Sequence, residues 1–247
     1  MMKNFLLSTL TILFMAFFWE LLAFKQIIDV QFFPPPHLFI AKMFELLKGD
    51  FFHNDLCNSL WRFFLAGLIS IPLACLLGLE AGASKIADRI INPFLALTYP
   101  LPKVAIFPLI LLIFGLGDSS KVILIAIGMF YLIYINVRNG TKRILTSSLM
   151  DIVHVYKISG WNYYYHFLLK GVFRDFLVGL KAALGYGLLL VVVSEFSVSK
   201  NGIGHFIWQA WDQFRIIDMY AGVLILCLLG LCFSYVLDTM IDKWTRT

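Results

Sequence analysis

Six stretches of the sequence are apolar over about 20 residues each, the length that an α-helix needs to cross roughly 30 Å of hydrocarbon. Such runs leave few folds open, because every backbone amide in lipid must find a partner within the protein. Only 14% of the 247 residues are charged, about half the share in a soluble domain. We therefore expect an all-α integral membrane protein. The six predicted transmembrane helices cover residues 5–24, 60–79, 93–114, 121–137, 176–195 and 219–238.

The whole chain, residues 1–247, is expected to form a single transmembrane domain, because no low-complexity tract or change of composition divides it. Its first apolar run follows Lys3, as in a signal peptide, but lacks a small-x-small cleavage site. The run is also long for a signal peptide and carries Trp19 and Glu20 near its far end. We therefore expect it to be retained as a membrane anchor.

Lysine and arginine are distributed unequally between the two sides of the predicted bundle. An even number of helices places both termini on one side, and the segments on that side hold most of the cationic residues. The positive-inside rule assigns this side to the cytoplasm, so we expect both termini there. The same bias explains the net charge of +5, so nucleic acid is not expected as a partner.

Residues 25–58, approximately, form the first outer segment in this topology. Its FFPPPH stretch is expected to be extended, because each proline restricts the residue before it. The following residues, 41–56, carry Met43, Leu46 and Leu47 on one side of a helical projection and charged residues on the other. We expect a short helix that lies on the outer surface.

The sequence lacks the residue patterns of catalytic and metal chemistry. Its five histidines form no HExxH motif, and its four cysteines show neither metal-ligand spacing nor a disulfide framework. A GxxxxGK[ST] phosphate loop is also missing, so we expect this chain neither to bind nor to hydrolyse ATP. We therefore predict no catalytic residue, no metal and no cofactor.

The third predicted helix is interrupted by prolines and contains a lysine. Pro93, Pro100, Pro102 and Pro108 break it, and Lys103 lies near its middle. Broken backbone at membrane depth persists only where protein or a water-filled cavity satisfies the freed carbonyls. We therefore predict that Pro100, Pro102 and Lys103 border a translocation pathway, the alternative being a structural kink.

The fifth predicted helix carries Lys181 near its start and Ser194 and Glu195 at its end. A carboxylate in an apolar span is costly to bury, so we assign all three residues to the pathway. The alternatives are that Glu195 meets water at the outer surface and that Lys181 snorkels to the inner interface. The second predicted helix has small residues at four-residue steps, which allow close helix packing in lipid. These are Ala74, Gly78 and Gly82.

From residue 33 to the C-terminus the sequence resembles the permease subunits of ATP-binding-cassette (ABC) importers, in particular the nitrate, sulfonate, taurine and bicarbonate group. The resemblance rests on four motifs in family order and spacing. They are the proline-rich NPFLALTYPLPKVAIFPLILLIFG, the FGLG turn at 114–117, the SE pair at 194–195 and the GIG at 202–204. It implies a type I (MetI-like) importer permease fold in a bacterial cell (inner) membrane.

The resemblance also assigns a role to the inner loop at about residues 138–175. In the family this EAA loop carries short coupling helices that insert into the ATPase, so that ATPase closure moves the spans as levers. The alternative is that its aromatic cluster lies on the inner lipid interface. The residues assigned to ATPase coupling are Asp151, Val153, His154, Lys157, Ser159, Gly160, Trp161, Tyr163 and Tyr164.

The loop departs from the family pattern in two ways. Lys157 occupies the family's glycine position, and the prolines expected near Lys170 and Arg174 are absent. Without that glycine, we expect the left-handed turn between the two short helices at Gly160.

The resemblance implies the translocation subunit of an ATP-driven importer rather than an enzyme. The implied partners are two ATPase subunits, a second permease copy in a homodimer, an extracytoplasmic solute-binding protein and the lipid bilayer. Lys103 and Lys181 suit a small anion such as a sulfonate, taurine or nitrate, while relatives also carry thiamine- or riboflavin-related precursors. A self-sufficient secondary transporter or channel would need an internal repeat and more intramembrane carboxylates. A membrane enzyme would need clustered His, Asp or Glu, which the sequence does not show.

Overall fold

The computed structural model describes residues 2–148, 150, 153, 155–157, 160 and 163–246, and these residues form helices, turns and bends without a strand. The predicted all-α fold is confirmed. Three short helical segments of other types accompany the α-helices: Phe52–Leu56 and Tyr163–Leu169 are π-helical, and Lys103–Ile106 is 3₁₀-helical. The helices are α1 (Met2–Phe24), α2 (Pro36–Lys48), α3 (Cys57–Ala83), α4 (Lys85–Thr98), α5 (Phe107–Phe114), α6 (Asp118–Leu145), α9 (Lys170–Val198), α10 (Ile203–Asp212) and α11 (Ile216–Arg246).

Four helical segments are long and apolar enough to cross a membrane: Phe52–Ala83, Asp118–Leu145, Phe167–Phe196 and Ile216–Lys243. The pair Lys85–Thr98 and Lys103–Phe114, whose two parts meet at 90°, makes a fifth span if it is counted as one. The apolar part of α1, Leu10–Phe24, is shorter than these spans. The predicted count of six therefore holds when α1 and the bent pair each count as one span.

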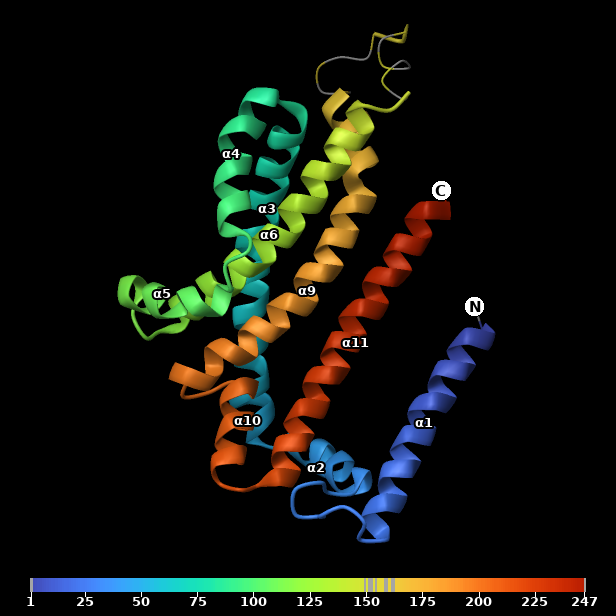
Figure 1. Cartoon of the computed structure of the whole chain (residues 1–247), viewed down its shortest axis with the longest axis vertical. Helices are drawn as coiled ribbons and strands as arrows, with labels where there is room; N and C mark the ends of the chain where they lie inside the picture. Colours follow the sequence, from blue (N-terminus) through green and yellow to red (C-terminus); the bar gives the residue numbers. More distant parts are fainter. Residues whose placement is uncertain are drawn as a thin grey trace.

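The core of the bundle is formed by α3, α6 and α9, which lie side by side in Figure 1. Close packing of α3 on α6 depends on its small residues. A Cβ atom on Gly78 would lie 2.9 Å from Val137, and one on Gly82 would lie 2.4 Å from Thr141. The predicted role of this ladder in helix packing is thereby confirmed.

A second apolar cluster joins α2 to α10 and α11 at the end of the molecule away from residue 145 (Figure 1). Pro35 has the polyproline-like ψ of 139°, and Pro36 starts α2, where its missing N–H costs no hydrogen bond. The helix thus begins five residues before the amphipathic stretch 41–56 and ends at Lys48. Met43 is buried in the cluster, as expected for the apolar side of a surface helix.

Candidate functional site

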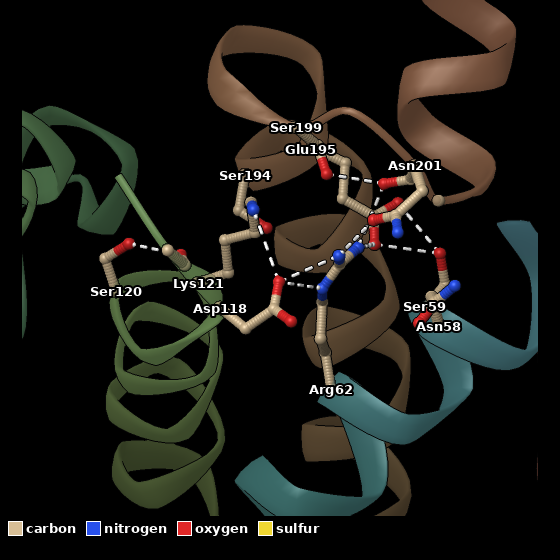
Figure 2. Close-up of polar contacts among 12 residues, drawn as sticks. Asn58, Ser59, Arg62, Asp118, Ser120, Lys121, Ser194, Glu195, Ser199 and Asn201 are labelled. Carbon is tan, nitrogen blue, oxygen red and sulfur yellow. Dashed lines mark hydrogen bonds and ion pairs between the residues drawn. The ribbon is translucent and has the colours of Figure 1, made fainter. Parts of the chain in front are cut away.

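A buried polar network lies where α3, α6 and α9 meet near α10 (Figure 2). At its centre is Arg62 on α3, with a side chain only 2% exposed. The guanidinium pairs with Glu195 on α9 at 2.7 Å and with Asp118, the first residue of α6, at 2.8 Å. It also donates to the backbone and side-chain oxygens of Asn201. The guanidinium thus makes four hydrogen bonds, and its ion pair with Asp118 adds a second contact to that carboxylate.

Glu195 is fully buried, and its carboxylate is held by groups from two other helices, α3 and α10. In addition to Arg62, it accepts hydrogen bonds from the Ser59 hydroxyl at 2.8 Å and from the Gly204 amide at 2.9 Å. A buried carboxylate without such partners would be strongly destabilising. Of the two placements that the sequence left open, water at the membrane surface is therefore ruled out in this structure.

The first amides of α10 are bound by side chains from other helices. Helix N-terminal amides have no acceptor within their own helix, so these contacts satisfy groups that would otherwise be unpaired. The acceptors also tie α10 to the beginning of α3 and the end of α9. The pairs are Gly202 to Asp55 at 2.8 Å, Ile203 to Ser59 at 2.8 Å and Gly204 to Glu195 at 2.9 Å.

The two glycines of the GIG motif are required by this close approach. Gly202 has φ +117°, a backbone conformation that side chains rarely adopt. A Cβ atom on Gly202 would lie 2.4 Å from the Glu195 carboxylate, and one on Gly204 would lie 2.5 Å from the Val192 carbonyl oxygen. The SE and GIG motifs are therefore two halves of one contact.

The 90° break between α4 and α5 is held by Lys103. Its side chain is buried, and its ammonium donates back to the carbonyls of Thr98 at 2.7 Å, Tyr99 at 3.1 Å and Leu101 at 3.1 Å. These carbonyls end α4 or lie in the turn that follows it. Lys103 therefore supplies the hydrogen bonds that a broken span loses, as the physics of the bilayer requires.

Lys103 also faces an aromatic ring, because its ammonium lies 4.1 Å from the ring centroid of Tyr131 on α6. The Tyr131 hydroxyl contacts the Thr98 hydroxyl at the end of α4. The cation–π contact and this hydroxyl pair fasten the break to α6.

Two cavities flank the break, and both are lined by Lys103 and Tyr131. One, of about 620 Å³, lies between α3, α4 and α6 and is mainly apolar. The other, of about 370 Å³, also includes Pro100, Pro102 and Tyr186. No carboxylate lines either cavity within the described part of the chain, so Lys103 contributes the formal charge there.

The predicted pathway residues fall into three places. Pro100, Pro102 and Lys103 meet at the smaller cavity. Glu195 belongs to the polar network, whereas the neighbouring Ser194 is buried and donates to the Val191 carbonyl of its own helix. Lys181 lies apart and pairs with Asp238 on α11, partly exposed, which is compatible with snorkelling. A role in translocation stays a prediction for all of them.

Much of the predicted coupling loop lies outside the described residues, including Asp151, His154, Ser159 and Trp161. Of the others, Val153 is buried, and Tyr163 and Tyr164 begin the π-helical segment Tyr163–Leu169. Gly160 has φ +64°, as expected of the left-handed turn, yet Lys157 also has a positive φ of +50°. The lysine at the family's glycine position thus adopts the glycine-like backbone as well.

The sequence-based prediction did not single out the centre of the network: Arg62 lies inside the predicted span 60–79, and Ser59 falls between this span and the outer segment 25–58. The signal that finds it is spacing. Asp55, Ser59 and Arg62 follow one another at four and three residues, so they share one face of a helix. Which carboxylates that face meets is decided by packing between distant segments. Within the described residues, no group of three or more His, Cys, Asp or Glu side chains is placed to hold a metal ion.

The model of the family described as "Binding-protein-dependent transport system inner membrane component" matches residues 70–246. The chain belongs to this permease family. Arg62 and Ser59 lie before the matched region, whereas Asp118, Glu195 and Gly204 lie within it. The resemblance inferred from the proline-rich, SE and GIG motifs is confirmed.

Relatives match the permease over most of its length. The putative aliphatic sulfonates transport permease protein SsuC of Bacillus subtilis is 28% identical over 232 residues, covering 93% of this chain and 84% of its own. The taurine transport system permease protein TauC of Escherichia coli is 24% identical, covering 86% and 78%. The formylaminopyrimidine transport permease protein ThiX of Halalkalibacterium halodurans is 25% identical, covering 90% and 88%.

The fold is also that of a solved permease. An inward-facing structure of the MetNI methionine ABC transporter superposes with a TM-score of 0.60 at 16% identity, covering 84% of this chain and 96% of the other. The likeness confirms the expected type I importer permease fold.

Proposed function

We propose that this permease is the translocation subunit of an ATP-driven importer for a small organic anion, an aliphatic sulfonate in the first instance. The observation that carries the proposal is the family match over residues 70–246. The chain is a permease subunit of an ABC importer, and ATP hydrolysis in such systems resides in a separate subunit. What the proposal adds is the energy source, the solute and the assembly.

The proposed assembly contains two copies of the permease, two ATPase subunits and an extracytoplasmic solute-binding protein. ATP binding closes the ATPase pair, and the loop at about residues 138–175 passes this movement to α6 and α9, which it connects. The bundle then opens toward the binding protein and receives the solute. Both termini and the loop lie in the cytoplasm in this scheme, in keeping with the distribution of Lys and Arg.

Two observations favour an anion. The relatives SsuC and TauC are named for sulfonate and taurine transport. The cavities beside the broken span carry the positive charge of Lys103 and no lining carboxylate in the described residues. The alternative solute is a thiamine-related precursor, supported by ThiX, which is named for formylaminopyrimidine transport.

Uptake by proteoliposomes tests the proposal. The permease is reconstituted with its ATPase and solute-binding protein, and radiolabelled ethanesulfonate and formylaminopyrimidine are offered separately. We expect ethanesulfonate uptake that needs ATP and stops when an ATPase variant unable to hydrolyse ATP is used. Uptake of formylaminopyrimidine alone would replace the anion with the alternative solute. Flux driven by an ion gradient without the ATPase would refute the importer and favour a secondary transporter.

A further inference from the structure

The helices α6 and α9 are linked to each other at both ends. At one end, residues 146–169 connect Leu145 of α6 to Lys170 of α9. We call Leu145 and Lys170 the loop ends of the two helices. At the other end, Asp118 of α6 and Glu195 of α9 are bound by the same guanidinium, that of Arg62 on α3. We call Arg62, Asp118 and Glu195 the clasp. A movement applied at the loop ends therefore reaches helices that a single side chain joins at their far ends.

The two ends are far apart, since α6 has 28 residues and an α-helix rises 1.5 Å per residue, which gives about 42 Å. Along this length α6 is packed closely on both neighbours. A Cβ atom on Gly179 of α9 would lie 2.8 Å from Asn136, and one on Gly82 of α3 would lie 2.4 Å from Thr141. Sideways movement between these helices is thus resisted along the bundle, and the clasp closes its far end.

The choice of an ion pair for this contact is informative. Apolar side chains of similar volume often stabilise a buried contact as well as a salt bridge does, so stability alone gives weak reason for burying Arg62 and Glu195. A planar guanidinium instead fixes direction, because each donor has a set orientation. Arg62 uses its donors on α6, α9 and Asn201 in the turn before α10 at once.

We propose that Arg62 is a positioning residue whose clasp on Asp118 and Glu195 makes α3, α6 and α9 move as one lever when the loop ends are displaced. The clasp itself depends only on this chain. Its part in transmission rests on the proposed function, because it needs an ATPase that pushes on the loop.

The decisive variant is Asp118→Ala. The Asp118 side chain is 59% exposed, so its removal opens little buried space. It takes away the contact with Arg62 and the weaker one with Lys121 at 3.4 Å, and it leaves the partners of Glu195 in place. Asp118→Glu keeps the charge and tests rescue. The comparison variant is Asp218→Ala, because Asp218 is likewise a first-turn aspartate of a span bound to an arginine, Arg215 at 2.6 Å. Its other ion pair is with Lys42 on α2, and at 14% exposed it is more buried than Asp118, so it is the more demanding test of a general loss of stability.

The readout is the distance between spin labels at Ser119 on α6 and Leu189 on α9, both exposed positions near the clasp. The full chain, with its four native cysteines replaced, is measured in nanodiscs without nucleotide. It is measured again in complex with its ATPase and a non-hydrolysable ATP analogue. We expect one narrow distribution in both states for the unmodified clasp, Asp118→Glu and Asp218→Ala.

For Asp118→Ala we expect a distribution about two-fold wider, with a mean that shifts when the ATP analogue binds, because α6 and α9 are then displaced separately. A distribution as narrow as that of the unmodified chain in both states would overturn the clasp. Broadening that ignores nucleotide and accompanies a lower unfolding temperature would show an ordinary structural contact and overturn the positioning role. Failure of the ATPase to bind the unmodified chain would refute the proposed function instead, while the nucleotide-free comparison still decides the clasp.

Discussion

Lys103 shows why a cation inside the membrane need not be free to bind solute. Its three ammonium donors all go to backbone carbonyls at the break between α4 and α5, and its remaining face meets Tyr131. Its charge can therefore attract an anion into the neighbouring cavity, but a direct hydrogen bond to solute would cost one of the carbonyl contacts. Lys103 thus stabilises the break between α4 and α5 and also gives the neighbouring cavity a positive electrostatic potential.

We expect Lys103→Met to lower both stability and uptake. Methionine fills a similar volume but cannot donate, and a carbonyl that is shielded from water and left without a donor costs about 1–3 kcal/mol. Lys103→Arg, which keeps the charge and the donors, should retain part of both properties. The measurements are the thermal unfolding midpoint in nanodiscs and ATP-driven uptake, with copurification of the ATPase expected to be unchanged. Unchanged uptake in the methionine variant would remove Lys103 from the pathway.

The close approach of the GIG motif to α9 can be tested by comparing Gly204 with Gly185, a glycine of α9 that lies outside the motif. Gly204→Ala places a methyl group 2.5 Å from the Val192 carbonyl oxygen, and backbone cannot easily yield, so we expect a loss of about 1–3 kcal/mol in unfolding free energy. Gly185→Ala on α9 meets open space within 4 Å and should leave stability equal or slightly higher. Chemical denaturation of the two variants under the same conditions measures the difference. Equal stability would mean that α10 shifts away from α9 without cost.

At the scale of one residue, the sequence predicts which polar groups lie inside the helical bundle, but it does not predict which residues they contact. Glu195 stood out because a carboxylate in an apolar run is rare, yet its partners Ser59 and Arg62 lie more than 130 residues away. No local pattern encodes such a pairing. Lys103 was likewise singled out, while its engagement with three nearby carbonyls depends on how the chain turns.

At the scale of helices, predicted and observed elements agree where periodicity and length decide, and differ where tertiary packing decides. Residues 60–79 and 121–137 lie inside longer helices, because the polar ends of α3 and α6 continue the helix beyond the apolar run. Residues 93–114, predicted as one span, form parts of two helices at 90°. The prolines predict such a break but not its angle, which is set by the contacts of Lys103 and Tyr131.

The loop that connects α6 to α9 offers a prediction at the same scale. We expect the double substitution Trp161→Asp and Tyr164→Asp to detach the ATPase, because charges replace the large aromatic side chains proposed to anchor it. The variant should still insert and keep its unfolding midpoint. Copurification of the ATPase with the tagged permease measures the effect, and Tyr156→Ala is a control for loss of an exposed aromatic residue in the loop. An ATPase that still copurifies would assign the aromatic cluster to the lipid interface.

At the scale of the whole molecule, the bundle has two unlike ends. One end carries α2 and α10, held together by the second apolar cluster and tied to the network through the GIG motif (Figure 1). The other carries the loop ends of α6 and α9 and the ion pair of Arg143 with Asp175. An importer needs this difference, because a binding protein must dock at one end and an ATPase at the other. The proposed orientation places α2 and α10 outside the cell.

Labelling of single cysteines in intact cells tests that orientation. On a background without the four native cysteines, Lys48→Cys reports on the end of α2 and Tyr156→Cys on the loop, both at exposed positions. We expect a membrane-impermeant maleimide to label position 48 in intact cells and position 156 only after permeabilisation, because the positive-inside rule places the loop in the cytoplasm. Permeabilised cells, in which both sites must react, control for reactivity. Labelling of position 156 in intact cells would put the loop outside, where no ATPase could reach it, and the importer mechanism would fall with it.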